Sequence, residues 1–237
     1  MNQLSANWIF AIVLATFWCL ATIALYQLAK AIHRRFARAW TAPIVLTPAM
    51  LATIALAFHV SYRDYASGAH WLVTLLGPAT VAFAIPIYQQ RRLVARHWPV
   101  LLVGALVGSA AAIASAWALA SLMGLGGDVR LSLLPRSVST PFAMTVSGDI
   151  GGAPNLTAVF VVFTGLFGAA IGETLLWWLP LRSPLARGAM FGMGAHAVGV
   201  AKALEIDRDQ GSIAGLVMVL VGVLNVLAAP LLAQVLR

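Results

Sequence analysis

Uncharged stretches divide the sequence into a series of apolar segments. Six of these stretches are long and contain no Lys, Arg, Asp or Glu: residues 1–29, 39–62, 65–90, 97–127, 150–172 and 210–236. About 20 apolar residues suffice for a helix that crosses a bilayer. Two further uncharged stretches, 137–148 and 188–201, are too short for a plain crossing. The pattern predicts an all-α polytopic membrane protein with about eight membrane segments, two of which (near 131–150 and 184–206) are broken or re-entrant helices.

The composition agrees with this pattern. Of the 237 residues, 61% are hydrophobic and 9% are charged, whereas an ordinary soluble domain has about 25% charged residues. This excludes a soluble globular enzyme, a disordered chain and a nucleic-acid-binding domain. The net charge of +8 does not alter the conclusion, because the 15 Lys and Arg residues lie between apolar stretches. We expect one integral membrane domain over 1–237, surrounded by the lipid bilayer, with no nucleic acid partner.

The sequence has no pattern typical of catalysis or of a metal centre. There is no nucleophile elbow, and no spacing of His, Asp and Glu suits a metal ion. The single cysteine, Cys19, lies in the first apolar stretch and cannot form a thiolate cluster within one chain. We therefore expect no enzymatic activity, no cofactor and no metal.

Basic residues follow the first and third apolar stretches. They are Lys30, Arg34, Arg35, Arg38, Arg91, Arg92 and Arg96. Loops rich in Lys and Arg stay in the cytoplasm, so the loops at 30–40 and 89–97 are expected inside and the N-terminus outside. In the second half, eight crossings would place Arg130, Arg136, Arg182 and Arg187 outside, against this rule. Either the first half dominates the orientation, or some of these charges are not loop charges.

The first unusual polar cluster surrounds Arg136. Thr140 followed by Pro141 is typical of a helix start, and the glycine-rich stretch 147–154 ends that helix after about two turns. The start of a helix offers free N–H groups and partial positive charge, to which Arg136 adds a full charge. One interpretation is an anion-binding pocket that includes Ser137, Ser139, Thr140 and Pro141. The alternative is a surface loop in which Arg136 anchors the chain at the membrane interface.

The second cluster surrounds His196. Histidine and lysine inside a membrane segment are energetically costly and indicate a functional site, so a helix broken near His196 is a candidate, with Lys202 six residues later. Lys202 could instead extend to the cytoplasmic face. For a coupling proton the candidates are His196, because an ordinary histidine side chain titrates near neutral pH, and Asp149, which precedes the glycine-rich break. If both clusters form one pocket, 136–152 and 192–205 must approach each other.

Four sequence motifs occur in an order that resembles the pattern of a known family. They are Arg-Ser-Val-Ser-Thr-Pro-Phe-Ala-Met at 136–144, Gly-Gly-Ala-Pro-Asn-Leu-Thr-Ala-Val-Phe-Val at 151–161, Ser-Pro-Leu-Ala-Arg-Gly at 183–188 and Ala-His-Ala-Val-Gly-Val-Ala-Lys-Ala at 195–203. The ordered set resembles the LrgB (CidB/LrgB-like, antiholin-like) membrane protein family, which is related to plastidal glycolate/glycerate translocators. The resemblance covers 71–237 well, as an LrgB-like core, and the two spans of 1–70 only by hydropathy.

The chain departs from the family pattern at several positions. Arg136 replaces a lysine, Ala195 and Ala197 replace a serine and a glycine beside His196, and Val200 replaces a threonine. Asp149 lies one position after the family's usual acid, which turns its side chain by about 100° on a helix.

The resemblance implies two functions, and the two polar clusters described above supply the expected site residues. One function is secondary transport of small carboxylates (glycolate, glycerate, pyruvate or lactate), with proton coupling, in the bacterial cytoplasmic (inner) membrane. The other is holin/antiholin-like control of murein hydrolase export and autolysis, or service as an accessory subunit of an LrgA-like partner. The candidate protein partners are a small LrgA/CidA-like membrane protein and further copies of this chain in a homo-oligomer. The expected substrate-binding residues are Arg136, Ser137, Ser139, Thr140, Pro141, Gly151, Gly152, Asn155, His196 and Lys202.

Overall fold

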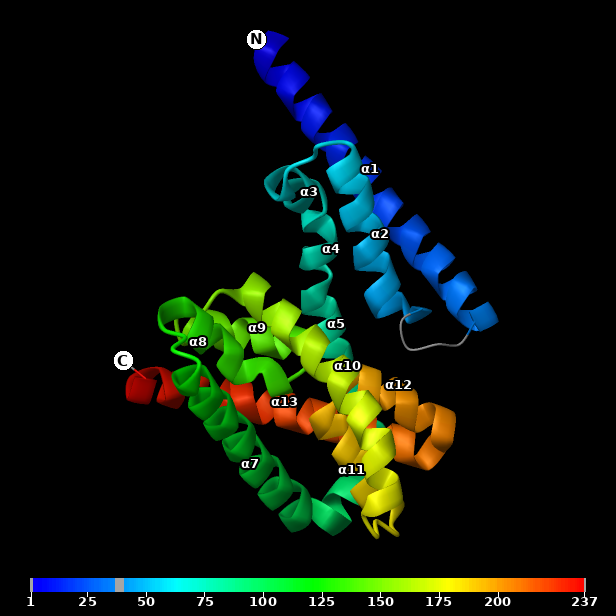
Figure 1. The fold of residues 1–237 in the computed structure, drawn as a ribbon, viewed down its shortest axis with the longest axis vertical. Coiled ribbons are helices and arrows are strands. Elements are labelled where there is room, and N and C mark those ends of the chain that lie inside the picture. The colour runs from blue at the N-terminus through cyan, green and yellow to red at the C-terminus, as the bar shows by residue number, and fades with distance from the viewer. Residues whose placement is uncertain (1, 37–40, 237) are drawn as a thin grey trace. The chain divides into compact units, whose positions relative to one another are not determined.

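The computed structural model describes residues 2–36 and 41–236, and it confirms an all-α membrane protein. The described residues are almost entirely helical and contain no β-strand. The helices are α1 (Asn2–Phe36), α2 (Pro43–Ala57), α3 (Tyr62–Gly68), α4 (His70–Thr74), α5 (Leu76–Ala82), α6 (Ala84–Gln89), α7 (Arg91–Leu122), α8 (Gly127–Leu133), the 3₁₀ helix η2 (Leu134–Ser137), α9 (Thr140–Asp149), α10 (Pro154–Trp178), α11 (Pro184–Gly194), α12 (His196–Ile206) and α13 (Arg208–Leu236) (Figure 1).

Five of the six long apolar stretches form helical stretches of the length that a bilayer crossing requires. By length and composition, five helical stretches can cross a bilayer: Ile12–Phe36, His70–Gln89, Arg91–Leu122, Pro154–Trp178 and Arg208–Val235. The stretch at 39–62 yields a shorter apolar helix, α2, of 15 residues. Arg38, one of the residues used to predict orientation, lies outside the described residues.

The chain divides into two compact units, Met1–Pro78 and Ala79–Arg237. In the first unit, α1 contacts α2, α3 and α4. Trp18 is buried and packs edge-on against Tyr65, with ring centroids 5.3 Å apart. The hydroxyl groups of Thr22 and Tyr65 lie 3.3 Å apart, which adds a polar contact between α1 and α3.

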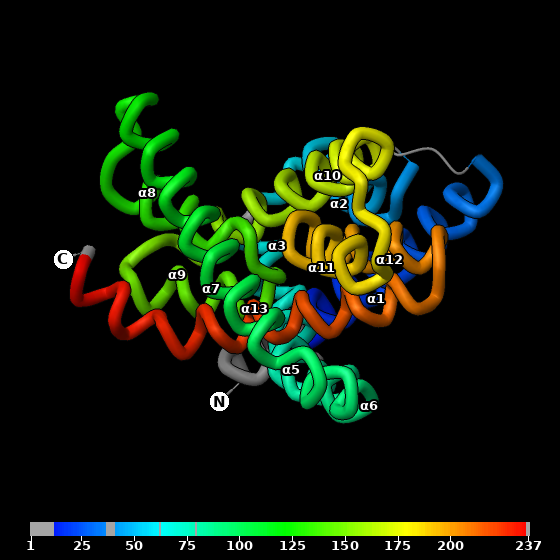
Figure 2. Tube along the Cα trace, turned by 90° about the horizontal axis from the view of Figure 1, so that it is seen from below, coloured from blue at the N-terminus to red at the C-terminus, as the bar shows by residue number. Residues whose placement is uncertain are grey.

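Helix α13 is the centre of the second unit. It contacts α6, α7, α9, α11 and α12 (Figures 1 and 2), and it is the most buried of the five long helical stretches. Glycine permits a close approach between α11 and α13, because a Cβ atom at Gly192 of α11 would overlap the carbonyl group of Ala214 in α13. Small residues of this kind let membrane helices pack backbone to backbone.

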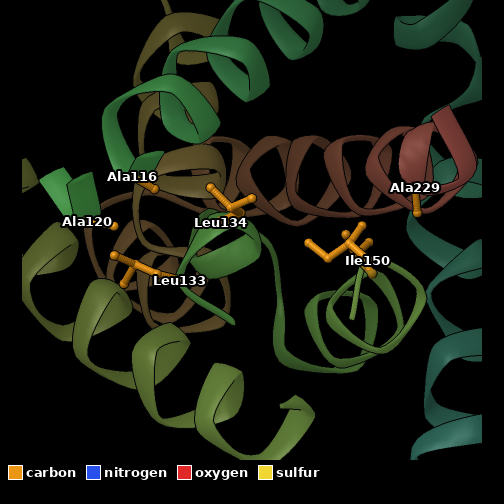
Figure 3. Close-up of a cluster of buried hydrophobic side chains, with 7 residues drawn as sticks. Ala116, Ala120, Leu133, Leu134, Ile150 and Ala229 are labelled. Carbon is orange, nitrogen blue, oxygen red and sulfur yellow. The ribbon is translucent and has the colours of Figure 1, made fainter. Parts of the chain in front are cut away.

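Helices α7 and α13 run side by side in the same direction. Near their starts, the side chain of Gln90 donates a hydrogen bond to the hydroxyl of Ser212. Further along, about five turns on α7 and between three and four turns on α13, the buried Asn225 amide donates to Ser109 Oγ over 2.9 Å. An apolar cluster of Ala116, Ala120, Leu133, Leu134, Val146, Ile150 and Ala229 then joins α7, α8, η2, α9 and α13 (Figure 3).

Both short segments are broken helices, as predicted. Val138 and Ser139 are extended, with ψ of 152° and 146°, and α9 begins directly afterwards with Pro141 in its first turn. The second break separates α11 from α12, where His196 has a φ of +49°. A positive φ is rare for residues other than glycine and marks local strain.

A buried hydroxyl network fixes the far end of α9. The Thr157 hydroxyl lies 2.7 Å from Ser147 Oγ and 3.0 Å from the Ser132 carbonyl oxygen, and Ser132 Oγ accepts a hydrogen bond from the Ala153 amide. These bonds join α8, α9 and α10. A Cβ atom at Gly152 would lie 2.6 Å from Ser147 Oγ and 2.9 Å from the Ser132 amide nitrogen, so the glycine is required for this close approach.

We predict that Thr157→Val destabilises the protein by about 1–3 kcal/mol, the usual effect of leaving buried polar partners unpaired. Valine keeps the branched shape, but Ser147 and Ser132 lose a hydrogen bond. The measurement is the thermal unfolding of the detergent-solubilised protein. Thr174→Val is the control, because Thr174 is exposed on the same helix and bonds only to its own preceding turn. Equal unfolding temperatures for the two variants would contradict the prediction.

Candidate functional site

Arg136 is the third of the four residues of η2, two positions before the break at Val138 and Ser139 that precedes α9. Its guanidinium donates to Ser115 Oγ of α7 over 3.3 Å and, more weakly, to Ser137 Oγ over 3.5 Å. Within the described residues all ion pairs involve Lys202, so Arg136 has no carboxylate partner there. A half-buried cation held only by hydroxyl groups remains free to bind an anion.

The neighbouring polar groups are buried without hydrogen-bond partners. Ser139 is 4% exposed and His196 is 3% exposed. Among the described residues, Ser139 Oγ and both imidazole nitrogens of His196 have no partner. Ser139 occupies the N-cap position of α9, yet its side chain makes no capping hydrogen bond. An unpaired buried polar atom is unfavourable by about 1–3 kcal/mol, so these atoms need a separate explanation.

The two helix breaks meet at this point. The imidazole of His196 lies close enough to the backbone of Ser137 and to the charge of Arg136 to interact with both electrostatically. It makes no hydrogen bond of normal geometry with either residue. One turn beyond His196, Val200 packs against an apolar cluster that includes Val138. Residues 136–139 and 196–200 therefore approach each other, as a shared pocket requires.

Thr140 and Pro141 form the first turn of α9, directly after this polar group, and both are partly exposed. The first amide groups of a helix lack partners within the helix, and these amides give the site a partial positive charge. Arg136, Ser137, Ser139, Thr140, Pro141 and His196 are the predicted site residues that the structure brings together.

A second group of predicted residues lies at the other end of α9. Asp149 is the last residue of this 10-residue helix, about 15 Å from its start. Asp149 and Asn155 are exposed, and Gly151 and Gly152 form the turn that packs on Ser132. The structure does not bring these four residues to Arg136 and His196, and the close packing at Gly152 gives that motif a structural role.

Lys202 occupies a third position. Its ammonium group lies 3.3 Å from a carboxylate oxygen of Glu173 in α10 and 3.4 Å from one of Glu205. It follows His196 by six residues on α12, which is about 9 Å along the helix axis. The lysine thus joins α10 to α12 instead of facing Arg136.

Several polar residues near the site were not predicted from the motifs. Ser115, which holds Arg136, and the Ser109–Asn225 pair all come from long apolar stretches. Hydrogen-bonding side chains inside a membrane helix usually face another helix, and this signal could have identified them. The described residues contain no group of three or more His, Cys, Asp or Glu side chains suited to a metal ion.

Comparison with known proteins identifies the family. The sequence profile of the LrgB-like family matches residues 22–235. The match therefore includes residues 22–70, which precede the motifs, as well as the core that contains them. Two relatives from Bacillus subtilis, the uncharacterized proteins YwbG and YxaC, are 39% and 36% identical over 89% and 90% of this chain and 94% and 92% of their own lengths. Holin-like protein CidB of Staphylococcus aureus (strain Mu50) is 29% identical over 93% of this chain and 96% of its own. No solved structure matches the chain.

Long apolar helices, two helix breaks at the expected motifs and a match over nearly the whole sequence agree with one another, and this bacterial membrane protein belongs to the LrgB-like family.

Proposed function

We propose that the protein is a secondary transporter of small carboxylates of the glycolate, glycerate, pyruvate and lactate class. The observation that carries the proposal is the group of unpaired polar atoms at Ser139 and His196 beside Arg136, which has no carboxylate partner among the described residues. Such a group is unfavourable in the absence of a ligand, and a hydroxy- or keto-carboxylate would satisfy it.

Each residue has a distinct role in this proposal. Arg136 pairs with the carboxylate, since a guanidinium can bind both carboxylate oxygens. The start of α9 adds amide groups and partial positive charge. Ser139 and His196 bond the hydroxyl or carbonyl group of the substrate. Ser137 Oγ and Ser115 Oγ, which accept hydrogen bonds from Arg136, orient its guanidinium.

The position of His196 favours it as the carrier of a coupling proton. It lies in the site, whereas Asp149 is exposed at the far end of α9. A group that exchanges its proton during transport must sense the substrate, and the distance along α9 weakens that interaction for Asp149.

We predict that Arg136→Ala lowers uptake at low substrate concentration by about tenfold or more, because hydrogen bonds to charged groups contribute about 1.5–3 kcal/mol. Arg136→Lys, which keeps the charge, retains more uptake. The measurement is saturable uptake of labelled glycolate, pyruvate and lactate into proteoliposomes.

The matched control is Arg130→Gln. Arg130 lies on α8 over the ring of Trp117, with 4.2 Å between its guanidinium carbon and the ring centroid, and its loss is expected to leave uptake near the unmodified level. The absence of saturable uptake of any of these acids by the unmodified protein would contradict the proposal. So would equal effects of the two arginine substitutions.

Ser139→Ala separates binding from stability. Since Ser139 Oγ has no partner in the described structure, its removal is expected to leave the unfolding temperature unchanged or raised. The KM for uptake is expected to rise several-fold, because the substrate loses a hydrogen bond. A lower unfolding temperature with an unchanged KM would show that the hydroxyl is structural.

A holin-like function is the second candidate, and the name of the CidB relatives favours it. In that case the purified protein forms large oligomeric pores and releases a trapped dye, and Arg136→Ala does not affect the release. Uptake that appears only when a small LrgA-like membrane protein is reconstituted with this chain would assign it the role of an accessory subunit.

We further propose a cytoplasmic-membrane location with the N-terminus outside. Alkaline phosphatase folds into an active enzyme only outside the cytoplasm, because it requires disulfides. Fusions after Asp64 and Gly124 are expected to be active, and fusions after Arg96 and Asp207 inactive. The reverse pattern would place the N-terminus inside.

A further inference from the structure

An open cleft lies apart from the polar site. It has a volume of about 440 Å³ and lies between α6, α12 and α13, with Pro86, Gln89, Val200, Leu204, Ser212 and Gly215 among its lining residues. The hydrogen bond from Gln90 to Ser212 holds the end of α6 on α13 beside it. Arg208 and Asp209 also line it, so part of its lining is charged.

One face of α12 leads from the cleft toward the polar site. Leu204, Val200 and His196 are spaced by four residues and therefore share a helix face. Leu204 and Val200 line the cleft together with Gly215. A Cβ atom at Gly215 would lie 3.9 Å from Val200 Cγ1, and we call Gly215 and Val200 the floor of the cleft. His196 lies one turn deeper, about 6 Å along the helix.

An apolar layer lies between the cleft and the buried polar atoms. Val200 packs on a cluster whose buried members include Val138, Phe142 and Met218. Phe83 covers Phe142 from the side of α6, with 5.6 Å between ring centroids. Ser139 directly follows Val138, so the unpaired hydroxyl lies at the edge of this layer. Apolar constrictions can close a water-filled path by excluding water.

We propose that the cleft is the vestibule by which substrate reaches the site, and that the layer formed by Val200, Phe142 and Met218 is its gate. This rests on the transport function proposed above. The vestibule opens on the side of the membrane that carries the 89–97 loop, because Gln89 and Gln90 border it. Substrate passes when α6 or α12 moves enough to separate the side chains of the layer.

The test is the labelling of single cysteines by a membrane-impermeant cationic methanethiosulfonate, in a Cys19→Ser background. Gly215→Cys probes the floor of the cleft, where a side chain has room. Ser139→Cys probes the site beyond the layer. Leu227→Cys is the control, because Leu227 is 72% exposed on the same helix α13 in an apolar stretch that would face lipid. Arg96→Cys marks the side of the 89–97 loop.

We expect Gly215→Cys to react from the same side as Arg96→Cys and much faster than Leu227→Cys or Ser139→Cys. Adding Val200→Ala is expected to speed the labelling of Ser139→Cys about tenfold, because burial of two methyl groups corresponds to about that factor. Val198→Ala is the matched control, since Val198 lies on α12 beside Gly165 of α10 and its truncation is expected to leave the rate unchanged.

Three results would overturn the proposal. They are a Gly215→Cys rate no higher than that of Leu227→Cys, labelling of Ser139→Cys as fast as that of Gly215→Cys, and equal effects of the Val200 and Val198 substitutions. Labelling requires no substrate, so the labelling rates can be interpreted even if the uptake assay detects no transport. Conversely, uptake without labelling at Gly215→Cys would retain the transport function and reject this entrance.

Discussion

The structure depends on one constraint: inside a bilayer, the polar groups of the backbone must find partners within the protein. Continuous helices meet this constraint by themselves. The breaks at Val138–Ser139 and at Ala195–His196 do not, so they are tolerable only where protein surrounds them. Both breaks are buried in the second unit, where α13 contacts α9, α11 and α12.

This constraint explains where small and hydroxyl-bearing residues lie. Gly192 brings α11 against the backbone of Ala214, and the Ser132, Ser147 and Thr157 network supplies partners at the far end of α9. The two ends of α9 thus differ: at one end the buried Ser147 hydroxyl is hydrogen-bonded to Thr157, and at the other the buried Ser139 Oγ is unpaired in the described structure. The unpaired end lies beside Arg136, and this contrast within one short helix supports the proposal that the binding site lies at that end.

Two cationic residues, Lys202 and Arg136, differ in the same way. Lys202 is paired with two carboxylates on a partly exposed surface, where ion pairs contribute little to stability. Arg136 instead is held by serine hydroxyls. Both residues lie within the range that matches the LrgB-like family, yet only Arg136 lies at the junction of the two breaks.

The sequence alone determined the fold class, because apolar length and scarce charge specify membrane helices without reference to their packing. It also determined both helix breaks: Thr140-Pro141 is a local signal for the start of a helix, and a histidine inside a membrane segment indicated the break at His196. Only the tertiary structure decided which candidates meet. Asp149, Asn155 and Lys202 are near Arg136 or His196 in sequence but are separated along helices, and Ser115 comes from a distant apolar stretch. Which side chains meet depends on which helix faces are in contact. Those contacts are set by the packing of the whole unit, and a residue's neighbours in the sequence do not reveal them.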